Sequence, residues 1–309
     1  MRALVTGGAG FIGSHLVDGL LEAGHAVTVL DNLATGLRSN LNHCIERIRF
    51  IEGDIRRLET VRDAVLEQDW VFHQAALGSV PRSVADPITS NAVNVEGTLN
   101  MLVASKDARV KRFLYASSSS VYGDTPTLPK IETMLTKPLS PYALTKLTAE
   151  EYCRIFYQVY GLETVALRYF NVFGERQRPD SQYAAVIPKF ITAILSDQAP
   201  VINGDGHHSR DFTYVSNNVH ANLLAANASA KNVAGKAFNI ACNHQFSLLE
   251  LVQTINQVLG KDIKPIFLAP RLGDVKHSRA GIDAAKEALE YEPLIQFVEG
   301  IEKTVKSYF

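Results

Sequence analysis

The chain has 309 residues, 46% of them hydrophobic, which is enough for a large core and for two domains of ordinary size. Its 31 Lys and Arg residues nearly balance 32 Asp and Glu residues, so the formal net charge of -1 gives no reason to expect nucleic acid or an anionic membrane as a partner. Three cysteines lie far apart and form no metal-spaced pair, which predicts reduced thiols and no metal site.

The amino-terminal residues enter an apolar strand almost at once. They lack a basic stretch followed by a cleavable apolar segment, which disfavours a secretory signal. No run approaches the roughly 20 apolar residues of a membrane span. We therefore expect a soluble, cytoplasmic protein.

Short apolar runs alternate with amphipathic stretches through the first half. Strands are expected at residues 3–6, 26–30, 70–72 and 113–115, and a helix at 11–23. Apolar strands separated by helices indicate a parallel sheet that is covered on both faces. Right-handed crossovers then produce a doubly wound α/β fold.

From Arg168 onward, glycine and proline become denser and the pattern changes. Helices joined by short extended pieces are expected over four ranges: 186–196, 215–228, 247–259 and 295–307. We therefore divide the chain into a nucleotide-binding domain at residues 1–167 and a smaller α/β domain, predominantly for substrate, at residues 168–309.

A glycine motif links the first strand to the first helix. Gly7 suits a tight turn, Gly10 lets the backbone approach a pyrophosphate, and Gly13 lets the helix pack on the strand. The helix amino terminus favours the phosphate anion. Asp31 ends the second strand, where it would bind ribose hydroxyls and repel a 2'-phosphate. The pattern predicts a Rossmann-type domain that binds NAD rather than NADP.

Tyr142 and Lys146 are four positions apart in a segment that reads as a helix. They therefore face the same way, and the ammonium group can favour the ionised form of the phenol. A shift of the phenol pKa from about 10 to about 7 needs roughly 4 kcal/mol, which Lys146 and an oxidised nicotinamide could supply together. Tyr142 is thus the predicted proton acceptor.

These motifs, in this order, resemble those of the extended short-chain dehydrogenase/reductase family over the whole chain. The resemblance implies that Asp54 contacts adenine, Lys146 the nicotinamide ribose and Asn94 the cofactor side of the site. The predicted cofactor-binding residues are Gly7, Gly10, Phe11, Ile12, Gly13, Asp31, Asn32, Asp54, Ile55, Ala75, Ala76, Asn94, Tyr142 and Lys146.

Ser118 occupies the place of the catalytic serine or threonine of this family, four residues before Tyr122. The resemblance implies that it hydrogen-bonds the reacting sugar oxygen. Dehydratases of the family carry Asp-Glu at the next two positions and decarboxylases keep a glutamate there, whereas this chain has Ser119 and Ser120. Elimination of water therefore lacks its expected acid and base, and reversible oxidation at one carbon is the reaction that remains possible.

The second half resembles the UDP-hexose 4-epimerase branch, in the subgroup similar to UDP-N-acetylglucosamine 4-epimerases. By this resemblance, Asn171, Arg210 and Arg271 contact the diphosphate or sugar, and Asp274 contacts the uridine ribose. Ser278 replaces a bulky aromatic residue and leaves room for an N-acetyl group. The predicted substrate-binding residues are Ser79, Ser118, Ser119, Ser120, Tyr142, Asn171, Ala185, Val186, Asn203, Arg210, Arg271, Asp274 and Ser278.

We therefore expect an enzyme that interconverts UDP-N-acetylglucosamine and UDP-N-acetylgalactosamine at C4, with bound NAD and catalytic Ser118, Tyr142 and Lys146. A UDP-glucose/UDP-galactose or UDP-glucuronate 4-epimerase is the alternative with the same centre. A non-catalytic NAD-binding sensor is the alternative from another class. The family resemblance also implies a homodimer through the helix near 90–106 and the helix that bears Tyr142.

Overall fold

A seven-stranded parallel sheet organises the part of the chain that the computed structural model describes, residues 1–179, 185–269 and 276–309. The strand order is β11-β6-β5-β4-β1-β2-β3. The strands are β1 (Arg2–Thr6), β2 (Ala26–Asp31), β3 (Ile48–Glu52), β4 (Trp70–His73), β5 (Arg112–Ser118), β6 (Thr164–Tyr169) and β11 (Lys236–Ile240). The order reverses between β1 and β4, as expected for a doubly wound fold.

One face of the sheet is covered by helices from both halves of the chain. The helices on this side are α1 (Phe11–Glu22), α8 (Val215–Asn227), α9 (Ala230–Val233) and α11 (Asp283–Leu289), with the 3₁₀ segment η1 (Arg38–Arg47). Leu16 and Leu20 of α1 are fully buried in the same apolar cluster as Val5 of β1 and Ala225 of α8. The second half thus completes the core of the first.

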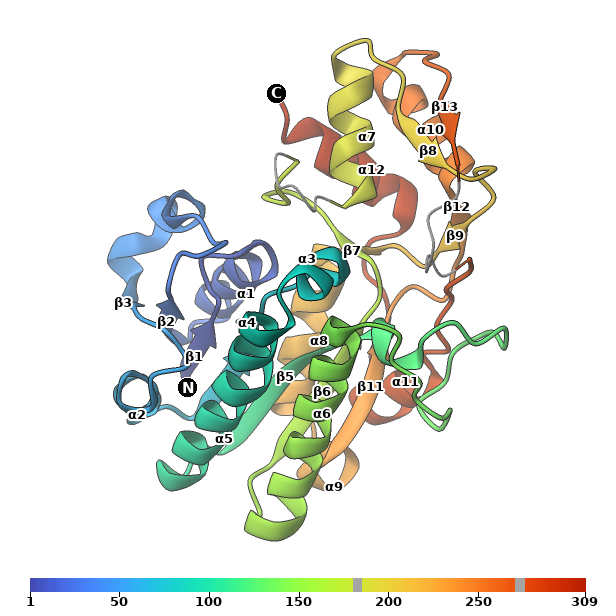
Figure 1. Cartoon of the computed structure of the whole chain (residues 1–309). Helices are drawn as coiled ribbons and strands as arrows, with labels where there is room; N and C mark the ends of the chain where they lie inside the picture. The colour runs from blue at the N-terminus through green and yellow to red at the C-terminus, as the bar shows by residue number, and fades with distance from the viewer. Residues whose placement is uncertain (180–184, 270–275) are drawn as a thin grey trace.

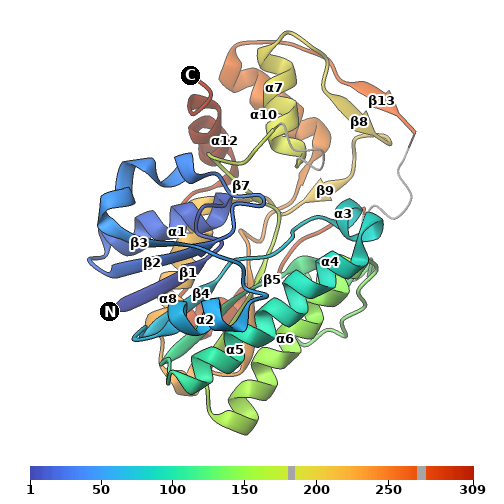
Figure 2. The same cartoon turned by 60° about the vertical axis from the view of Figure 1, so that its left-hand side comes forward.

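The opposite face carries helices from the first half. They are α2 (Leu58–Val65), α3 (Val80–Ala85), α4 (Pro87–Asn91), the π-helical turn η2 (Ala92–Glu96), α5 (Gly97–Asp107) and α6 (Pro141–Tyr160). Figure 2 shows α4 and α5 following one another along one line over the sheet, with α6 beside them. Met101, Phe113 and Cys153 are buried together in the cluster beneath them.

A smaller layer lies beyond one end of the sheet, at the top of Figure 1. It contains the helices α7 (Val186–Leu195), α10 (Leu248–Leu259) and α12 (Phe297–Lys306). Its strands are short and form separate pairs. β10 (Thr213–Tyr214) pairs with β7 (Val172–Phe173), β12 (Phe246–Ser247) with β9 (Ser209–Arg210), and β13 (Ile266–Leu268) with β8 (Val201–Asn203). Phe297 is buried at the centre of this layer and stacks on Phe246 with ring centroids 4.0 Å apart.

Local sequence signals explain where α6 begins and ends. The Ser140 hydroxyl accepts a hydrogen bond from the Ala143 N–H (3.1 Å), and proline occupies the first helical position. Gly161 ends the helix in the left-handed conformation, with φ of 73°. These caps place Tyr142 and Lys146 in the first two turns of the helix.

The expected Rossmann-type α/β fold is confirmed, and each expected strand and helix is present with small shifts in its bounds. The boundary that we predicted between residues 167 and 168 lies within β6. β11 pairs with β6 in the main sheet, and α8 packs on that sheet, so residues after 168 contribute to both parts. Among the described residues, no helix has both the length and the apolar character needed to span a membrane.

We expect Phe297→Ala to lower the free energy of unfolding by about 3–5 kcal/mol, because it removes a buried ring at the centre of the smaller layer. Urea denaturation followed by circular dichroism measures this change. Val298→Ala is the matched control, since the neighbouring Val298 is 50% exposed and should change stability by less than about 0.5 kcal/mol. Equal effects of the two substitutions would contradict this account of the core.

Candidate active site

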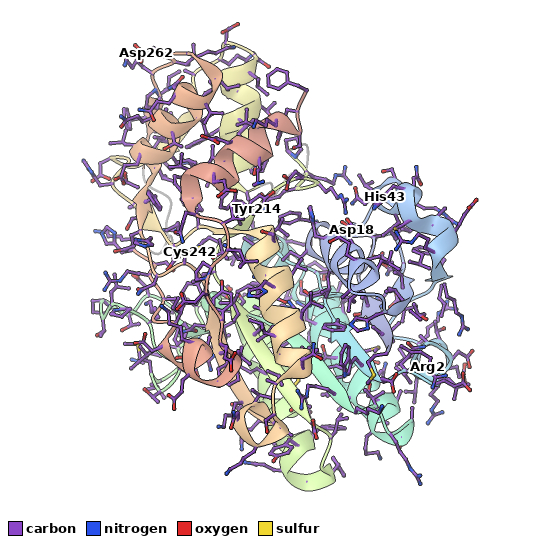
Figure 3. The ribbon with its side chains drawn as sticks, turned by 180° about the vertical axis from the view of Figure 1, so that it is seen from behind. Arg2, Asp18, His43, Tyr214, Cys242 and Asp262 are labelled. Atoms are coloured by element: carbon purple, nitrogen blue, oxygen red, sulfur yellow. The ribbon has the colours of Figure 1, made fainter. Side chains whose placement is uncertain are left out.

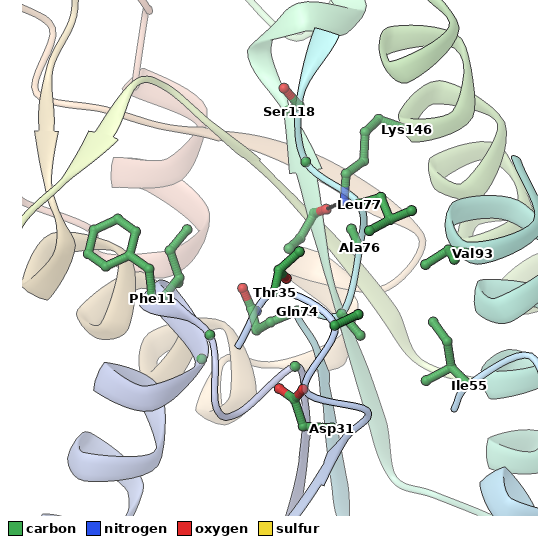
Figure 4. A pocket seen from close by; sticks show the side chains of 18 of the residues that line it. Phe11, Asp31, Thr35, Ile55, Gln74, Ala76, Leu77, Val93, Ser118 and Lys146 are labelled. Atoms are coloured by element: carbon green, nitrogen blue, oxygen red, sulfur yellow. Dashed lines mark hydrogen bonds between the residues drawn. The ribbon is translucent and has the colours of Figure 1, made fainter. Parts of the chain in front are cut away.

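A cavity of about 640 Å³ opens where the parallel strands end. Its walls come from the ends of the strands β1 to β6, from the segments that follow them and from α6. Figure 4 shows Asp31 at one end of this cavity and Ser118 with Lys146 at the other. The cavity therefore lies at the point where the strand order reverses, which is the usual ligand site of a doubly wound sheet.

The glycine turn after β1 forms part of the cavity wall. Gly7 has φ of +68°, and a Cβ there would lie 2.8 Å from the Ala75 backbone. A Cβ on Gly13 would overlap the Gly7 carbonyl. Gly10 caps α1 without a side-chain hydrogen bond, which leaves the first N–H groups of the helix without a side-chain acceptor. A cradle of this shape suits a pyrophosphate, and the contact itself stays a prediction.

Asp31 is buried at the end of β2 and orders the loop around it. Its two carboxylate oxygens accept hydrogen bonds from the N–H groups of Ala9 (2.9 Å) and Leu33 (2.8 Å). Burial raises the pKa of Asp31, and these two hydrogen bonds oppose that rise. Because each carboxylate oxygen can accept a further hydrogen bond, Asp31 fits the predicted contact with ribose hydroxyls.

Asp54 follows β3 beside Asp31 in the same cavity wall. Arg56 donates to both of its oxygens, with Nη2 2.6 Å from Oδ2, and Asn32 donates a further hydrogen bond to Oδ2 (3.1 Å). The hydrogen bond from Arg56 lowers the pKa of Asp54 to about 2. Asp54 is thus an ionised acceptor at this end, consistent with its predicted contact with adenine.

Ser118, Tyr142 and Lys146 meet at the other end of the cavity. Ser118 ends β5, and its Oγ accepts hydrogen bonds from the N–H (3.2 Å) and hydroxyl (2.9 Å) of Ser120. Lys146 extends from α6 and donates from Nζ to the carbonyl of Ala116 (2.8 Å). The strand end and the helix therefore bring together the three residues predicted to be catalytic.

Burial dominates the electrostatics of this end. It raises the pKa of Tyr142, while a hydrogen bond with Ser118 acts in the opposite direction. It also lowers the pKa of Lys146 to about 8. Lys146 is not among the causes of the shift at Tyr142 in the protein without cofactor, so the lowering of the phenol pKa by Lys146 together with an oxidised nicotinamide stays a prediction.

The carboxylates among the described residues lining the cavity are Asp31 and Asp54. Both belong to the β2–β3 side, and β1 and β4 separate β2 from β5 in the sheet. Ser119 and Ser120 occupy the two positions after Ser118, as the sequence requires. No carboxylate in the described lining therefore accompanies Ser118 and Tyr142.

The other predicted cofactor residues behave differently from one another. Phe11, Ile12, Asn32, Ile55, Ala75 and Ala76 line the cavity together with the glycines. Asn94 does not: it is buried in η2, accepts from the N–H of Leu77 (2.8 Å) and donates to the Leu77 carbonyl (3.2 Å). Since Leu77 lines the cavity, Asn94 acts on the site by fixing the backbone that forms its wall.

The predicted substrate residues are more dispersed. Asn171 lines the cavity and donates to the Asp211 carbonyl (3.2 Å). Ser118, Ser119, Ser120 and Tyr142 also line it. The remaining described members lie outside its lining: Ser79 caps α3, Ala185 and Val186 begin α7, Asn203 ends β8, Arg210 ends β9, and Ser278 is buried beside β9. Arg271 and Asp274 lie outside the described residues.

The lining also contains residues that the sequence patterns did not identify. These are Leu30, Ala34, Thr35, Gly53, Arg56, Gln74, Leu77, Gly78, Thr89, Val93, Ala116, Ser117, Tyr169, Val172 and Gln177. Gln74 is connected to Tyr169 and Asn222 by side-chain hydrogen bonds. Its position directly after β4 was the available signal, because residues at the carboxyl ends of parallel strands face the ligand crevice.

A group of possible metal ligands lies away from this cavity, between α1 and η1 (Figure 3). Asp18, His43 and Cys44 place their ligand atoms within 4.8 Å of one another. Asp18 already pairs with His43 (2.7 Å) and with Arg176 (2.8 Å). Because the guanidinium group opposes a second cation, these residues are explained as an ion-pair network.

Residues 3–241 match the NAD dependent epimerase/dehydratase family. The chain belongs to this family. The structure is similar to a UDP-N-acetylglucosamine 4-epimerase from Methanobrevibacter ruminantium M1 in complex with UDP-N-acetylmuramic acid, with 42% identity, a TM-score of 0.94, and coverage of 99% of this chain and 97% of that one.

Two further relatives belong to other epimerase types. The UDP-glucose 4-epimerase of Mycolicibacterium smegmatis is 38% identical over 312 residues, covering 100% of this chain and 98% of that protein. A UDP-glucuronic acid 4-epimerase from Bacillus cereus, in complex with UDP-glucuronic acid and NAD, is 32% identical, with a TM-score of 0.92 and coverage of 99% and 98%. The predicted extended short-chain dehydrogenase/reductase family, NAD cofactor and epimerase class are confirmed.

Lys146→Met should change how the stability of the cofactor-free protein depends on pH. The folded pKa of Lys146 is about 8, against 10.5 for an unperturbed lysine, so between these values the unfolded chain binds a proton that the folded chain lacks. Wild-type stability relative to Lys146→Met should therefore rise with pH in this window, by up to about 1.4 kcal/mol per unit.

Urea unfolding at several pH values between 7 and 10.5 measures this difference. Lys303→Met, on an exposed side chain of α12, is the control for the removal of a lysine. A wild-type to Lys146→Met difference that stays flat across the window would contradict the pKa of about 8.

Proposed function

We propose that this protein is an NAD-dependent UDP-sugar 4-epimerase that interconverts UDP-N-acetylglucosamine and UDP-N-acetylgalactosamine. The observation that carries the proposal is the arrangement of Ser118, Tyr142 and Lys146 at one end of a cavity whose other end presents Asp31. One end suits oxidation of a hydroxyl-bearing carbon, and the other suits the adenosine of NAD.

Tyr142 is the proposed base for the C4 hydroxyl of the sugar. Its hydrogen bond with Ser118 stabilises the ionised phenol, and Ser118 can in turn hydrogen-bond the reacting oxygen. Bound NAD would supply the hydride acceptor and donor for C4, and its positive nicotinamide ring would favour the phenolate. Lys146 is held by the Ala116 carbonyl and adds a second positive charge, which is strong because the site is buried.

Epimerisation requires the sugar to present both faces of C4. The 4-keto sugar must therefore turn over while its nucleotide stays bound, which is possible when the binding energy resides on the UDP group. We propose Asn171, Arg210, Arg271 and Asp274 as the UDP contacts. Asn171 is the member of this set that lines the described cavity.

Dehydration and decarboxylation are disfavoured by the same geometry. A dehydratase needs an acid and a base beside the reacting sugar. In the described cavity, serines occupy the positions after Ser118, and the carboxylates lie at the Asp31 end. Transfer of the C4 hydride from the sugar to NAD and back to the sugar needs neither an additional acid nor an additional base.

The preference for an acetylated sugar rests on Ser278. Its backbone N–H donates to the Ser209 carbonyl (3.1 Å), so pairing with β9 fixes the backbone here, and the side chain is short. The similar epimerase from Methanobrevibacter ruminantium is named for UDP-N-acetylglucosamine, which favours the same choice. Ser79, Ala185, Val186 and Asn203 remain proposed contributors to the sugar pocket.

The homodimer remains a prediction. Apolar side chains are exposed on α6, including Val159 (65% exposed), and on α4 just before the predicted helix near 90–106, at Ile88 (82% exposed). These surfaces would be covered if α6 and the α4–α5 region paired with their symmetry mates.

Purified wild-type protein should convert UDP-N-acetylglucosamine to UDP-N-acetylgalactosamine faster than it converts UDP-glucose to UDP-galactose. Tyr142→Phe should lower both rates by at least about a hundredfold, since it removes the proton acceptor, and should leave NAD binding within about threefold. Chromatography of the sugar nucleotides measures the first effect, and NAD titration measures the second.

UDP-glucuronate is tested in parallel. Preferential conversion of UDP-glucose or UDP-glucuronate would replace the proposed substrate while keeping the enzyme class. If NAD binds but none of the three sugar nucleotides turns over, the non-catalytic sensor takes the place of the enzyme.

Ser278→Tyr should lower the rate for the acetylated sugar by at least about tenfold relative to UDP-glucose, because the ring would occupy the space of the N-acetyl group. Ser278→Ala is the matched control and should keep the ratio of kcat/KM values for the two sugars. An unchanged ratio of kcat/KM values in Ser278→Tyr would contradict the proposal that Ser278 lines the sugar pocket.

A further inference from the structure

A buried ion pair lies directly behind the reacting centre. Glu150 of α6 and Arg168 of β6 have side chains only 5% and 7% exposed, and Arg168 Nη2 is 2.6 Å from Glu150 Oε1. Arg168 Nε adds contacts to both carboxylate oxygens. Such a pair gives little net stability, because desolvation offsets its attraction, so its fixed geometry is the property to explain.

The ion pair holds both ends of the turn that carries Ser118. On one side, Ser117 donates from its hydroxyl to Glu150 Oε2 (2.5 Å). On the other side, Arg168 donates from Nη1 to the hydroxyl of Tyr122 (2.7 Å), which ends the 3₁₀ segment η3 (Ser119–Tyr122). Ser117 and Tyr122, which flank Ser118 in the chain, are therefore hydrogen-bonded to the two members of one ion pair.

The end of β5 also makes successive side-chain contacts with α6. The Ala116 carbonyl accepts from Lys146 Nζ, and the hydroxyl of the next residue, Ser117, donates to Glu150. The side chain of Ser118 interacts with that of Tyr142. Because Tyr142, Lys146 and Glu150 are spaced by four residues, they lie along one face of the helix. The strand end is thus aligned with the helix by three consecutive contacts.

We propose that the Glu150–Arg168 pair is a clamp that holds the turn bearing Ser118 against Tyr142. Glu150, Arg168, Ser117 and Tyr122 are then positioning residues, which act on the reaction through Ser118. The kinetic part of this inference rests on the proposed epimerase function. The geometric part, which concerns how Ser118 meets Tyr142, requires only that the protein binds NAD.

Two substitutions loosen the clamp at opposite ends without removing a buried charge. Ser117→Ala removes the hydroxyl bound to Glu150, and Tyr122→Phe removes the hydroxyl bound to Arg168 while keeping the ring on which the guanidinium lies. Ser105→Ala is the matched control, because Ser105 is fully buried in α5 and its hydroxyl has no hydrogen-bond partner in the described structure. Melting temperatures establish that each variant is folded.

In NAD-loaded protein, both clamp variants should lower kcat about tenfold and leave the KM for the sugar nucleotide and the NAD affinity within about twofold, since a displaced hydroxyl weakens one hydrogen bond at the reacting centre. Near-ultraviolet difference absorbance measures ionisation of Tyr142, with Tyr142→Phe subtracted to remove other phenols such as the neighbouring Tyr115. The apparent pKa of Tyr142 should rise by about half a unit or more in both variants.

The outcomes separate the clamp from the enzyme assignment. If wild-type protein epimerises and the clamp variants match Ser105→Ala in kcat and in phenol titration, the clamp is refuted and the epimerase stands. If no sugar nucleotide turns over but both clamp variants shift the phenol titration, the epimerase fails and the clamp stands. The proposal would also be overturned if the apparent pKa of Tyr142 rose in only one of the two clamp variants, or if kcat fell in both while that pKa stayed unchanged.

Discussion

Parallel strand pairing is the constraint on which the active site depends. β1 pairs in parallel with β2 and β4, and β5 pairs in parallel with β4 and β6. The carboxyl ends of these strands therefore lie at the same edge of the sheet. The glycine turn after β1, Asp31 after β2 and Ser118 at the end of β5 therefore line one cavity. The reversal of strand order beside β1 separates the covering loops and opens the crevice between them.

Electrostatic conditions differ between the two ends of that cavity. At the adenosine end, Arg56 supplies a local counter-charge and keeps Asp54 ionised. At the reacting end, desolvation dominates and favours the neutral forms of Tyr142 and Lys146. A buried base of this kind is sensitive to any added positive charge or hydrogen bond, because these act in a medium of low polarity. Precise placement of Ser118 therefore matters more here than it would on the surface.

Much of the fold was predictable because its signals are local. Apolar runs identified β1, β2, β4 and β5, and Ser140 with Pro141 is the local signal for the start of α6. The roles of Asn94 and Gln74 were not predictable in the same way. Asn94 is a candidate contact in the sequence, but the fold directs its amide to the backbone of Leu77, 17 residues away. Gln74 reaches Tyr169 and Asn222, whose proximity depends on packing between distant segments.

The sequence by itself determined the cofactor turn, the spacing of Tyr142 and Lys146, and the serines at Ser119 and Ser120, because each depends on residues close together in the chain. Only the tertiary structure decided how far each reacting group is desolvated, and therefore that burial raises the pKa of Tyr142 in the protein without cofactor. It also decided that Glu150 meets Arg168 behind Ser118. Desolvation and ion pairing both depend on which distant segments surround a side chain, and local residue patterns do not contain that information.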